Sequence, residues 1–179
     1  ATALTPGISR KVLDLWKAYM KEEWPEYGRK IMDLLPGSIM RVIPVNESIE
    51  PESRILAYDD VIKIIENART LSVTKCSCRV IDGACGKPLE VCMQVDRAAE
   101  YNLDRGTGRA LSKTEAIEIV KMCEEEGLVH VADNRQVVGH VICNCCKDCC
   151  LNWPIMTGPK KWVAPSRFEA VVDPDLCTG

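Results

Sequence analysis

The ten residues 141–150, "VICNCCKDCC", contain five cysteines, and this crowding limits what the chain can fold into more than any other feature. The full chain of 179 residues holds eleven cysteines, more than a core uses as small apolar side chains. A chain of this length buries enough apolar surface to fold without covalent staples. Adjacent pairs such as Cys145–Cys146 and Cys149–Cys150 make poor disulfides, because a bridge needs separated Cα atoms and a defined torsion. The clustered thiols therefore point to metal binding.

The cellular setting supports the same interpretation. The first twenty residues lack the apolar core of a signal peptide, and no stretch of the chain is apolar for the length that crosses a bilayer. We therefore expect a cytoplasmic protein without a membrane span, in a reducing compartment where thiols stay free to bind metal.

Nine cysteines fall into two clusters and are the expected metal and cofactor ligands. The first cluster is "CSCRVIDGACGKPLEVC", which supplies Cys76, Cys78, Cys85 and Cys92. The second is "CNCCKDCC", which supplies Cys143, Cys145, Cys146, Cys149 and Cys150. Of the two cysteines that stand apart, Cys123 is expected to be a small buried apolar residue of a helix.

The spacing favours an iron–sulfur cluster over zinc. Structural zinc usually takes two Cys-x-x-Cys knuckles, and the first cluster has none, although Cys146 and Cys149 would form one. Iron–sulfur clusters accept four thiolates at more varied spacings. Cations near the ligands would offset the negative charge of such a cluster; they are Lys75, Arg79, Lys87 and Lys147. We expect one or two 4Fe–4S clusters, with zinc as the alternative.

The pairing of the cysteines into sites stays open at this point. Cys145 and Cys146 are neighbours, so their side chains point in different directions. If the segment becomes helical, Cys146, Cys149 and Cys150 share a face, and Cys143 or Cys145 would complete four ligands. An equally acceptable arrangement combines Cys76 and Cys78 with residues of the second cluster. Nine thiols would serve two four-ligand sites with one left over.

Hydrophobic periodicity predicts a mainly α protein with a small β-hairpin (α+β). Two amphipathic helices are expected in 9–35, with Val12, Leu15, Trp16 and Tyr19 on one stripe, and further helices in 58–68, 89–103 and 112–127. A short strand is expected at 71–75 and a hairpin in 128–143. Helix, helix and hairpin follow the order of a winged helix, with the cysteines in its loops.

Three regions follow from this organisation. They are the N-terminal helices and linker at 1–50, a winged-helix-like metal-binding domain at 51–165, and a short C-terminal segment at 166–179. The helix at 112–127 begins with the capping box of Ser112 and Glu115 and ends before Gly127, which is placed as a C′ glycine.

The charge pattern argues against nucleic acid as a partner. The chain carries a net charge of −3, and acidic side chains dominate the helix at 112–127, so it would repel phosphates. No Ser/His/Asp or Cys/His constellation stands out, and His130 and His140 are expected to be surface residues rather than ligands. We therefore expect an electron-transfer protein more than an enzyme. The alternative is a winged-helix module, stabilised by zinc or by a cluster, that senses redox state or binds a partner. An enzyme with an open iron site is a third class.

Several short sequence motifs together resemble those of a known family. They are "RVIPVNESIE", "CSCR", "KPLEVC", "RGTGRALSKTEA", "EEEGLVH", "ICNCCKDCC" and "PSRFEAVVDPDLCTG", which span about residues 40 to 179. This combination resembles ferredoxin-type 4Fe–4S proteins in which a cysteine-rich N-terminal region precedes a ferredoxin module. The resemblance implies iron–sulfur binding and electron transfer with a partner oxidoreductase in anaerobic metabolism. It also implies that Cys177 begins the ligand run of a ferredoxin-like module that is truncated here.

Overall fold

The computed structural model describes residues 4, 6–45, 60–83, 85–134, 140–156, 163–164 and 171–177. Its helices are α1 (Arg10–Glu22), α2 (Trp24–Leu34), α3 (Val61–Asn67), α4 (Ser77–Asp82), α5 (Arg97–Asp104), α6 (Lys113–Glu125) and α7 (Trp153–Met156). Its strands are β1 (Met40–Val42), β2 (Leu71–Lys75), β3 (Glu90–Val95), β4 (Arg109–Ala110), β5 (Val129–Asp133), β6 (Val141–Cys145) and β7 (Val163–Ala164).

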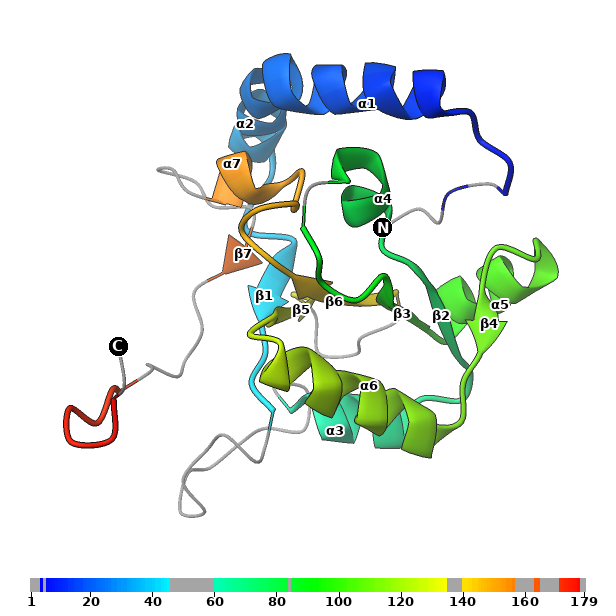
Figure 1. The fold of residues 1–179 in the computed structure, drawn as a ribbon, viewed down its shortest axis with the longest axis vertical. Helices are drawn as coiled ribbons and strands as arrows, with labels where there is room; N and C mark the ends of the chain where they lie inside the picture. The colour runs from blue at the N-terminus through cyan, green and yellow to red at the C-terminus, as the bar shows by residue number, and fades with distance from the viewer. Residues whose placement is uncertain are drawn as a thin grey trace.

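The strands form one mixed sheet in the order β4-β2-β3-β6-β5-β1-β7. Neighbours are antiparallel except β1 and β7, which are parallel. Figure 1 shows the sheet across the middle of the molecule, with helices on both sides. The described residues therefore form an α/β fold, and the expectation of a mainly α protein with a small hairpin is wrong.

The error arises mainly in residues 89–103, which were expected to be one helix. The first part is strand β3, and only the second part is helix α5. Five consecutive residues of β3 are buried, because the strand lies inside the sheet and both of its faces are covered. A buried strand of this kind shows no alternation of apolar and polar residues, so periodicity alone does not distinguish it from a helix.

The winged-helix interpretation is wrong for a related reason. Strands β5 and β6 do pair antiparallel, as the arms of the expected hairpin should. However, β6 also pairs with β3, and β5 also pairs with β1, so the two strands lie in the interior of a wide sheet and are not a peripheral wing. Part of the expected turn, at 135–136, lies outside the described residues, as do the proposed boundaries at 50–51 and 165–166. The division into regions stays a prediction.

The ends of α6 confirm the local analysis of that helix. Ser112 Oγ accepts a hydrogen bond from Glu115 N at 3.2 Å, and Glu115 Oε2 accepts one from Ser112 N at 2.8 Å. Gly127 follows the helix with φ of 68°, and the next residue, Leu128, donates its N–H to Cys123 O at 2.9 Å. These bonds satisfy backbone groups that the helix ends leave open.

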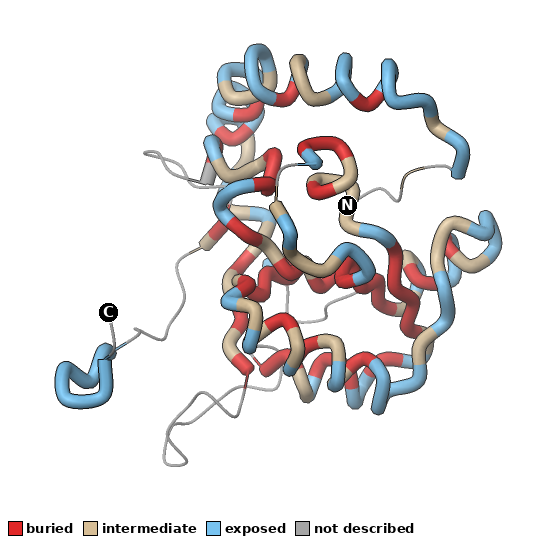
Figure 2. The backbone as a smooth tube through the Cα atoms, viewed as in Figure 1, coloured by how far each residue is buried: buried red, intermediate tan, exposed pale blue. Residues whose placement is uncertain are grey.

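The main apolar core lies on one face of the sheet. Leu71 and Val73 of β2, with Met93 and Val95 of β3, pack there against α3 and α6. Buried residues, drawn in red in Figure 2, run along the sheet and along the helix sides that face it. On the other side of the sheet lie α1, α2, α4 and α7, so the segments that carry the cysteines are enclosed between two layers.

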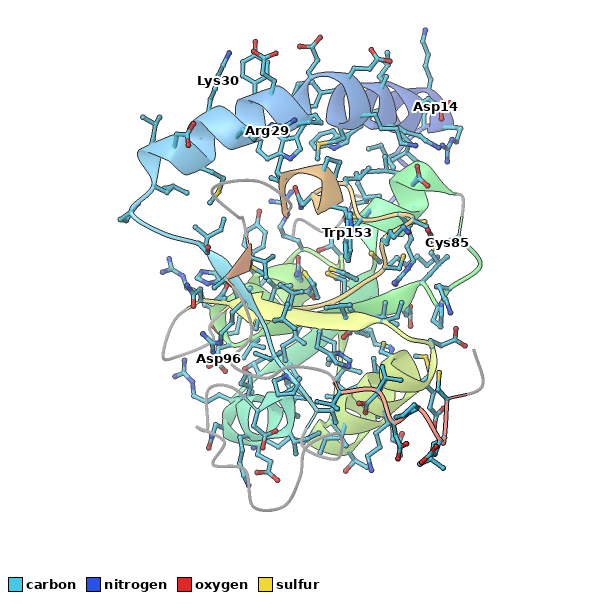
Figure 3. The ribbon with its side chains drawn as sticks, turned by 90° about the vertical axis from the view of Figure 1, so that its left-hand side faces the viewer. Asp14, Arg29, Lys30, Cys85, Asp96 and Trp153 are labelled. Carbon is cyan, nitrogen blue, oxygen red and sulfur yellow. The ribbon has the colours of Figure 1, made fainter. Side chains whose placement is uncertain are left out.

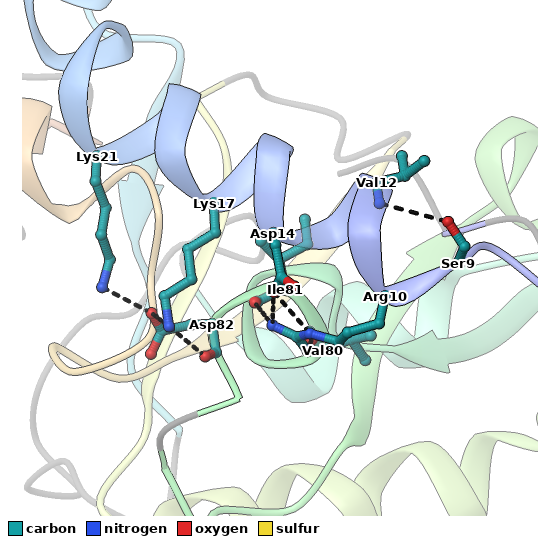
Figure 4. Close-up of polar contacts among 9 residues, drawn as sticks. All are labelled: Ser9, Arg10, Val12, Asp14, Lys17, Lys21, Val80, Ile81 and Asp82. Carbon is teal, nitrogen blue, oxygen red and sulfur yellow. Dashed lines mark hydrogen bonds and ion pairs between the residues drawn. The ribbon is translucent and has the colours of Figure 1, made fainter.

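Helix α1 is fixed to α4 by charged side chains, as Figure 4 shows. Lys17 Nζ lies 3.1 Å and Lys21 Nζ 2.9 Å from Asp82 Oδ1, and the Asp82 side chain is 2% exposed. Arg10 Nη2 donates to the Ile81 carbonyl at 3.1 Å. The ion pairs hold the pKa of Asp82 below its ordinary value, chiefly through Lys21, against the opposing effect of burial.

The apolar stripe of α1 is turned away from this contact. The inward side chains are Leu13 and Met20, which are buried against Ile81 and Leu151. The residues of the expected stripe are instead exposed on the outside, namely Val12, Leu15, Trp16 and Tyr19. Among the described residues, no helix is both long and apolar enough to cross a membrane.

We predict that Asp82→Asn lowers the free energy of unfolding by about 2 kcal/mol, because bonds to a buried charge contribute roughly 1.5–3 kcal/mol. Asp14→Asn is the matched control, since Asp14 pairs with Arg10 at 2.7 Å with both side chains more than half exposed. This change should cost less than about 0.5 kcal/mol. Urea unfolding of both variants measures the difference, and equal losses would contradict the anchoring role of Asp82.

The same pair of variants has an expected pH dependence. Because the folded-state pKa of Asp82 lies below 3.8, its contribution is present above that pH and is lost as the pH falls through the folded-state pKa. Wild type and Asp82→Asn should therefore converge in stability in acid.

Candidate metal centre

Three segments bring the clustered cysteines together. The first runs from the end of β2 through α4 into the following loop, the second is β3, and the third is β6 with the turn after it. Cys85, in the loop after α4, lies beside that helix on the same side of the sheet as Trp153 (Figure 3). The structure thus combines residues of the first and second sequence clusters, which is the mixed arrangement that the spacing left open.

The strand register explains the first contacts. Met93 of β3 pairs with Ile142 of β6, so the next position places Cys92 opposite Cys143. Met93 and Ile142 face the main core. Because successive side chains of a strand alternate between faces, Cys92 and Cys143 project to the opposite face, and Cys145 follows two residues along β6.

A chain of interacting thiols continues from these residues. Cys143 contacts Cys92 and Cys145, Cys145 contacts Cys150, and Cys150 contacts Cys78. Cys78 in turn contacts Cys76, which is the N-cap residue of α4. We call this set the six-thiol group; its members are Cys76, Cys78, Cys92, Cys143, Cys145 and Cys150.

The remaining three clustered cysteines form a second set, the three-thiol group of Cys85, Cys146 and Cys149. Their sulfur atoms all lie within 4.8 Å of one another, and Cys85 Sγ is 3.7 Å from Cys146 Sγ. Cys146 and Cys149 are buried, whereas Cys85 is half-buried. Three thiols at this spacing form a site that could hold a metal ion or a cluster.

The adjacent cysteine pairs are divided between the two groups. Cys145 belongs to the six-thiol group and Cys146 to the three-thiol group, and Cys150 and Cys149 are divided in the same way. Neighbouring residues project in different directions, so each pair serves both groups from one short segment. This division explains why five cysteines are crowded into "CNCCKDCC".

Hydrogen bonds within the six-thiol group favour the ionisation of some thiols over others. The bonds from Cys145 and Cys78 lower the pKa of Cys150 to about 4. Bonds from Cys145 and Cys92 hold the pKa of Cys143 well below its usual range. The bond between Cys78 and Cys150, with burial, raises the pKa of Cys78 to about 11. Two thiolates are thus stabilised by neighbouring thiols, and the thiolate is the form that binds metal.

The three-thiol group shows the same division. Burial opposes ionisation of Cys85, but hydrogen bonds from the Cys149 thiol and the Lys87 N–H lower its pKa overall. Burial and the bond to Cys85 raise the pKa of Cys149 to about 12. Each group therefore contains a thiol whose ionisation its neighbours favour, and the remaining protons leave when the metal binds.

One buried cation lies among the thiols. Arg79 is 2% exposed, and its guanidinium donates from Nη1 to the Pro88 carbonyl at 2.9 Å and from Nη2 to the Asn144 carbonyl at 2.8 Å. Burial opposes its charge, yet the charge of Cys76 and a hydrogen bond to Cys146 raise the pKa of Arg79. Its Nε has no hydrogen-bond partner among the described residues.

The other cations that were expected to offset a cluster lie elsewhere. Lys87 binds Glu126, with Nζ 2.7 Å from the backbone oxygen and 3.1 Å from Oε2. Lys75 and Lys147 are exposed. Of these cations, Arg79 is therefore the one placed between the two thiol groups.

Buried polar side chains support the strands that carry the ligands. Gln94 Nε2 donates to Thr74 Oγ1 at 3.2 Å and to the Cys92 carbonyl at 2.9 Å, and its Oε1 accepts from Ser72 Oγ at 3.1 Å. Asn144 Nδ2 donates to the Val91 carbonyl at 2.6 Å, which joins β6 to β3 beside the thiols. Nothing in the sequence distinguished these residues from ordinary polar positions, because their role arises from strand pairing.

A cavity of about 40 Å³ lies between the thiols. Its lining includes Arg79 and eight of the nine clustered cysteines, all except Cys85. The cysteines outside the clusters take no part in it: Cys123 is fully buried on α6 beside Cys146 and Cys149, and Cys177 is exposed in the segment 171–177.

Both histidines have polar partners, and the expectation that they lie on the surface is wrong for His130. His130 is buried, and its Nδ1 lies 2.6 Å from Asn144 Oδ1, while its Nε2 has no partner among the described residues. His140 Nδ1 lies 3.1 Å from Asp133 Oδ2, and its side chain is 57% exposed. The short contact with the Asn144 oxygen requires that His130 Nδ1 donates, so a neutral ring satisfies it.

We predict that stability falls as the pH drops below about 6.5 and that His130 is one cause. Burial lowers the pKa of His130, so the unfolded chain binds a proton that the folded chain rejects. In metal-free, reduced protein, His130→Gln should show a smaller loss of unfolding free energy between pH 7 and pH 5 than wild type. The exposed His140→Gln should retain the wild-type loss, and a His130→Gln profile parallel to wild type would refute the assignment.

Comparison with known proteins gives no relative for this arrangement. No protein-family model, no curated protein and no solved structure matches the chain.

Proposed function

We propose that the protein binds iron–sulfur clusters of the 4Fe–4S type at its thiol groups and transfers electrons to or from a partner oxidoreductase. The observation that carries this proposal is the cavity lined by eight cysteines. Thiolates are the ligands that iron–sulfur clusters require, and the nine clustered cysteines supply enough for two centres.

The size of the cavity favours a group of several atoms over a single ion. Tetrahedral thiolates that close on one zinc ion leave no empty space between them. The cavity measures about 40 Å³, whereas one water molecule needs roughly 10–15 Å³ on the same measure. Inorganic sulfide and iron would occupy such a space, with the surrounding thiolates bound to iron.

The surroundings also suit a redox centre. A cluster with four thiolates is negatively charged, and the buried Arg79 supplies one compensating charge. Hydrogen bonds and burial are two of the means by which a protein sets a cluster's potential. Because residues 145 and 146 belong to different thiol groups, two centres would be separated by only a few covalent bonds, a short path for one electron.

A partner surface is available on the layer that covers the centre. The stripe of exposed apolar side chains on α1 lies on the outside of the helix that packs on α4. Exposed apolar surface of this kind is typical of sites that contact another protein. Docking there would bring a partner oxidoreductase to the side of the sheet that carries the thiols.

Zinc is a second candidate, and one distance favours it. Two sulfurs on a tetrahedral zinc ion with Zn–S bonds of about 2.3 Å lie about 3.8 Å apart. Cys85 Sγ and Cys146 Sγ are 3.7 Å apart. A zinc ion at the three-thiol group would make the protein a metal-stabilised module for interaction or redox sensing.

Analysis of iron, zinc and acid-labile sulfide in anaerobically purified protein tests the proposal. Iron and sulfide in equal amounts, near four or eight per chain, are expected together with a broad visible absorption. Cys150→Ser should reduce the iron and sulfide content, whereas the matched Cys123→Ala, which alters a buried thiol outside both groups, should retain it. Zinc without sulfide would reject the iron–sulfur proposal in favour of the second candidate.

A further inference from the structure

We propose that the three-thiol group forms a metal centre with one open coordination position. A small anionic ligand from outside the chain occupies this position, and Arg79 binds that ligand. The preferred ligand is an anionic sulfur donor, either hydrosulfide or the thiolate of a small molecule. This inference rests on the proposed function in one respect, namely that these thiols bind metal.

The first observation is the number of ligands. Within the described residues, the sulfur atoms of Cys85, Cys146 and Cys149 lie within 4.8 Å of one another, and no fourth ligand atom of a suitable type lies within that distance of all three. Metals that bind thiolates in tetrahedral geometry take four ligands. Protein sites with three ligands leave the fourth position for water or a substrate.

The second observation is the unpartnered donor beside the group. Arg79 is almost fully buried and interacts with the thiols of Cys146 and Cys85, yet its Nε–H has no hydrogen-bond acceptor within the described residues. A buried donor without an acceptor costs about 1–3 kcal/mol, so such groups usually mark a ligand or water that completes the bond. An anion at the fourth position would supply the acceptor.

The charges are consistent with an anionic ligand. Three thiolates on a divalent metal ion carry a net charge of about −1, and the guanidinium brings the sum close to zero. An added anion then costs less than it would at a site already carrying uncompensated negative charge. A soft metal site built from thiolates favours sulfur among anionic ligands.

Access is available from one side. Cys146 and Cys149 are buried, but Cys85 is half-buried in the loop after α4. Cys85 is also the one clustered cysteine that does not line the internal cavity. A small ligand would therefore reach the three-thiol group past Cys85.

Cobalt(II) provides a direct test, because its visible bands report the number and type of its ligands. The probes are azide, as an anion without sulfur, 2-mercaptoethanol, as a source of a thiolate, and imidazole, as a neutral ligand. In the cobalt-loaded wild-type chain we expect both anionic probes to shift the bands, the thiolate at lower concentration, and imidazole to act more weakly. Absence of any shift in a protein that shows thiolate-to-cobalt absorption would overturn the inference. Absence of that absorption itself would reject the proposed metal centre.

Two variants localise the ligand. Cys85→Ser removes one ligand of the three-thiol group and should abolish the azide response, while cobalt bound to the six-thiol group keeps its own absorption. Arg79→Gln should weaken azide binding at least tenfold. An unchanged azide response in Cys85→Ser, or unchanged affinity in folded Arg79→Gln, would contradict the proposal.

Two further variants address a misfolded Arg79→Gln chain and an alternative fourth ligand. If Arg79→Gln loses the near-ultraviolet dichroism of the folded chain, Arg79→Lys takes its place; it retains the charge but lacks the planar donors, and it should bind azide more weakly than wild type. Cys123→Ala tests the alternative that Cys123, which packs against Cys146 and Cys149, occupies the fourth position. Loss in Cys123→Ala of the part of the thiolate-to-cobalt absorption that Cys85→Ser also removes would overturn the open-position model.

Discussion

The pairing of β3 with β6 is the constraint on which the site depends. Its register sets Met93 against Ile142 in the main core and, one position along, Cys92 beside Cys143 on the other face. A shift of one residue would turn every side chain of the strand to the wrong face, so the apolar core also fixes the position of the thiols. The bond from Asn144 to the Val91 carbonyl reinforces the same pairing.

This strand register allows one short segment of the chain to supply cysteines to two different thiol groups. The turn after β6 sends one member of each adjacent cysteine pair to the six-thiol group and the other to the three-thiol group. Arg79 stands between them, with its guanidinium fixed by the carbonyls of Pro88 and Asn144. Helix α1 closes the arrangement through Asp82, so the layer that covers the site is held by charge as well as by apolar packing.

The sequence predicted the parts of the structure whose signals are local. The capping box of Ser112 and Glu115, the glycine after α6 and the pairing of β5 with β6 are confirmed. The crowding of the cysteines also indicated a metal site, and the structure places three of them at ligand spacing. These features depend on a few neighbouring residues, so no knowledge of the tertiary fold was needed.

The parts that failed depend on contacts between distant segments. The sequence predicts a helix where strand β3 lies, because burial on both faces removes the alternation that identifies a strand. Without a strand predicted at β3, the pairing of β5 with β6 indicates a peripheral wing, whereas the structure places both strands inside a wide sheet. Arg79, and not the neighbouring lysines, is the cation buried beside the thiols. The spacing of residues in the sequence does not indicate which cation is buried. The predicted 4Fe–4S clusters, the partner and the resemblance to ferredoxin-type proteins stay predictions.

Each adjacent cysteine pair is divided between two separate thiol groups. The most direct test compares the metal content of two double variants, Cys145→Ser with Cys150→Ser and Cys146→Ser with Cys149→Ser. Each double variant is expected to lose the metal of one group and to retain that of the other, with different spectra, and all four changes together should remove both. Loss of all metal in either double variant, with the fold retained, would show that the nine cysteines form a single centre and would contradict the account.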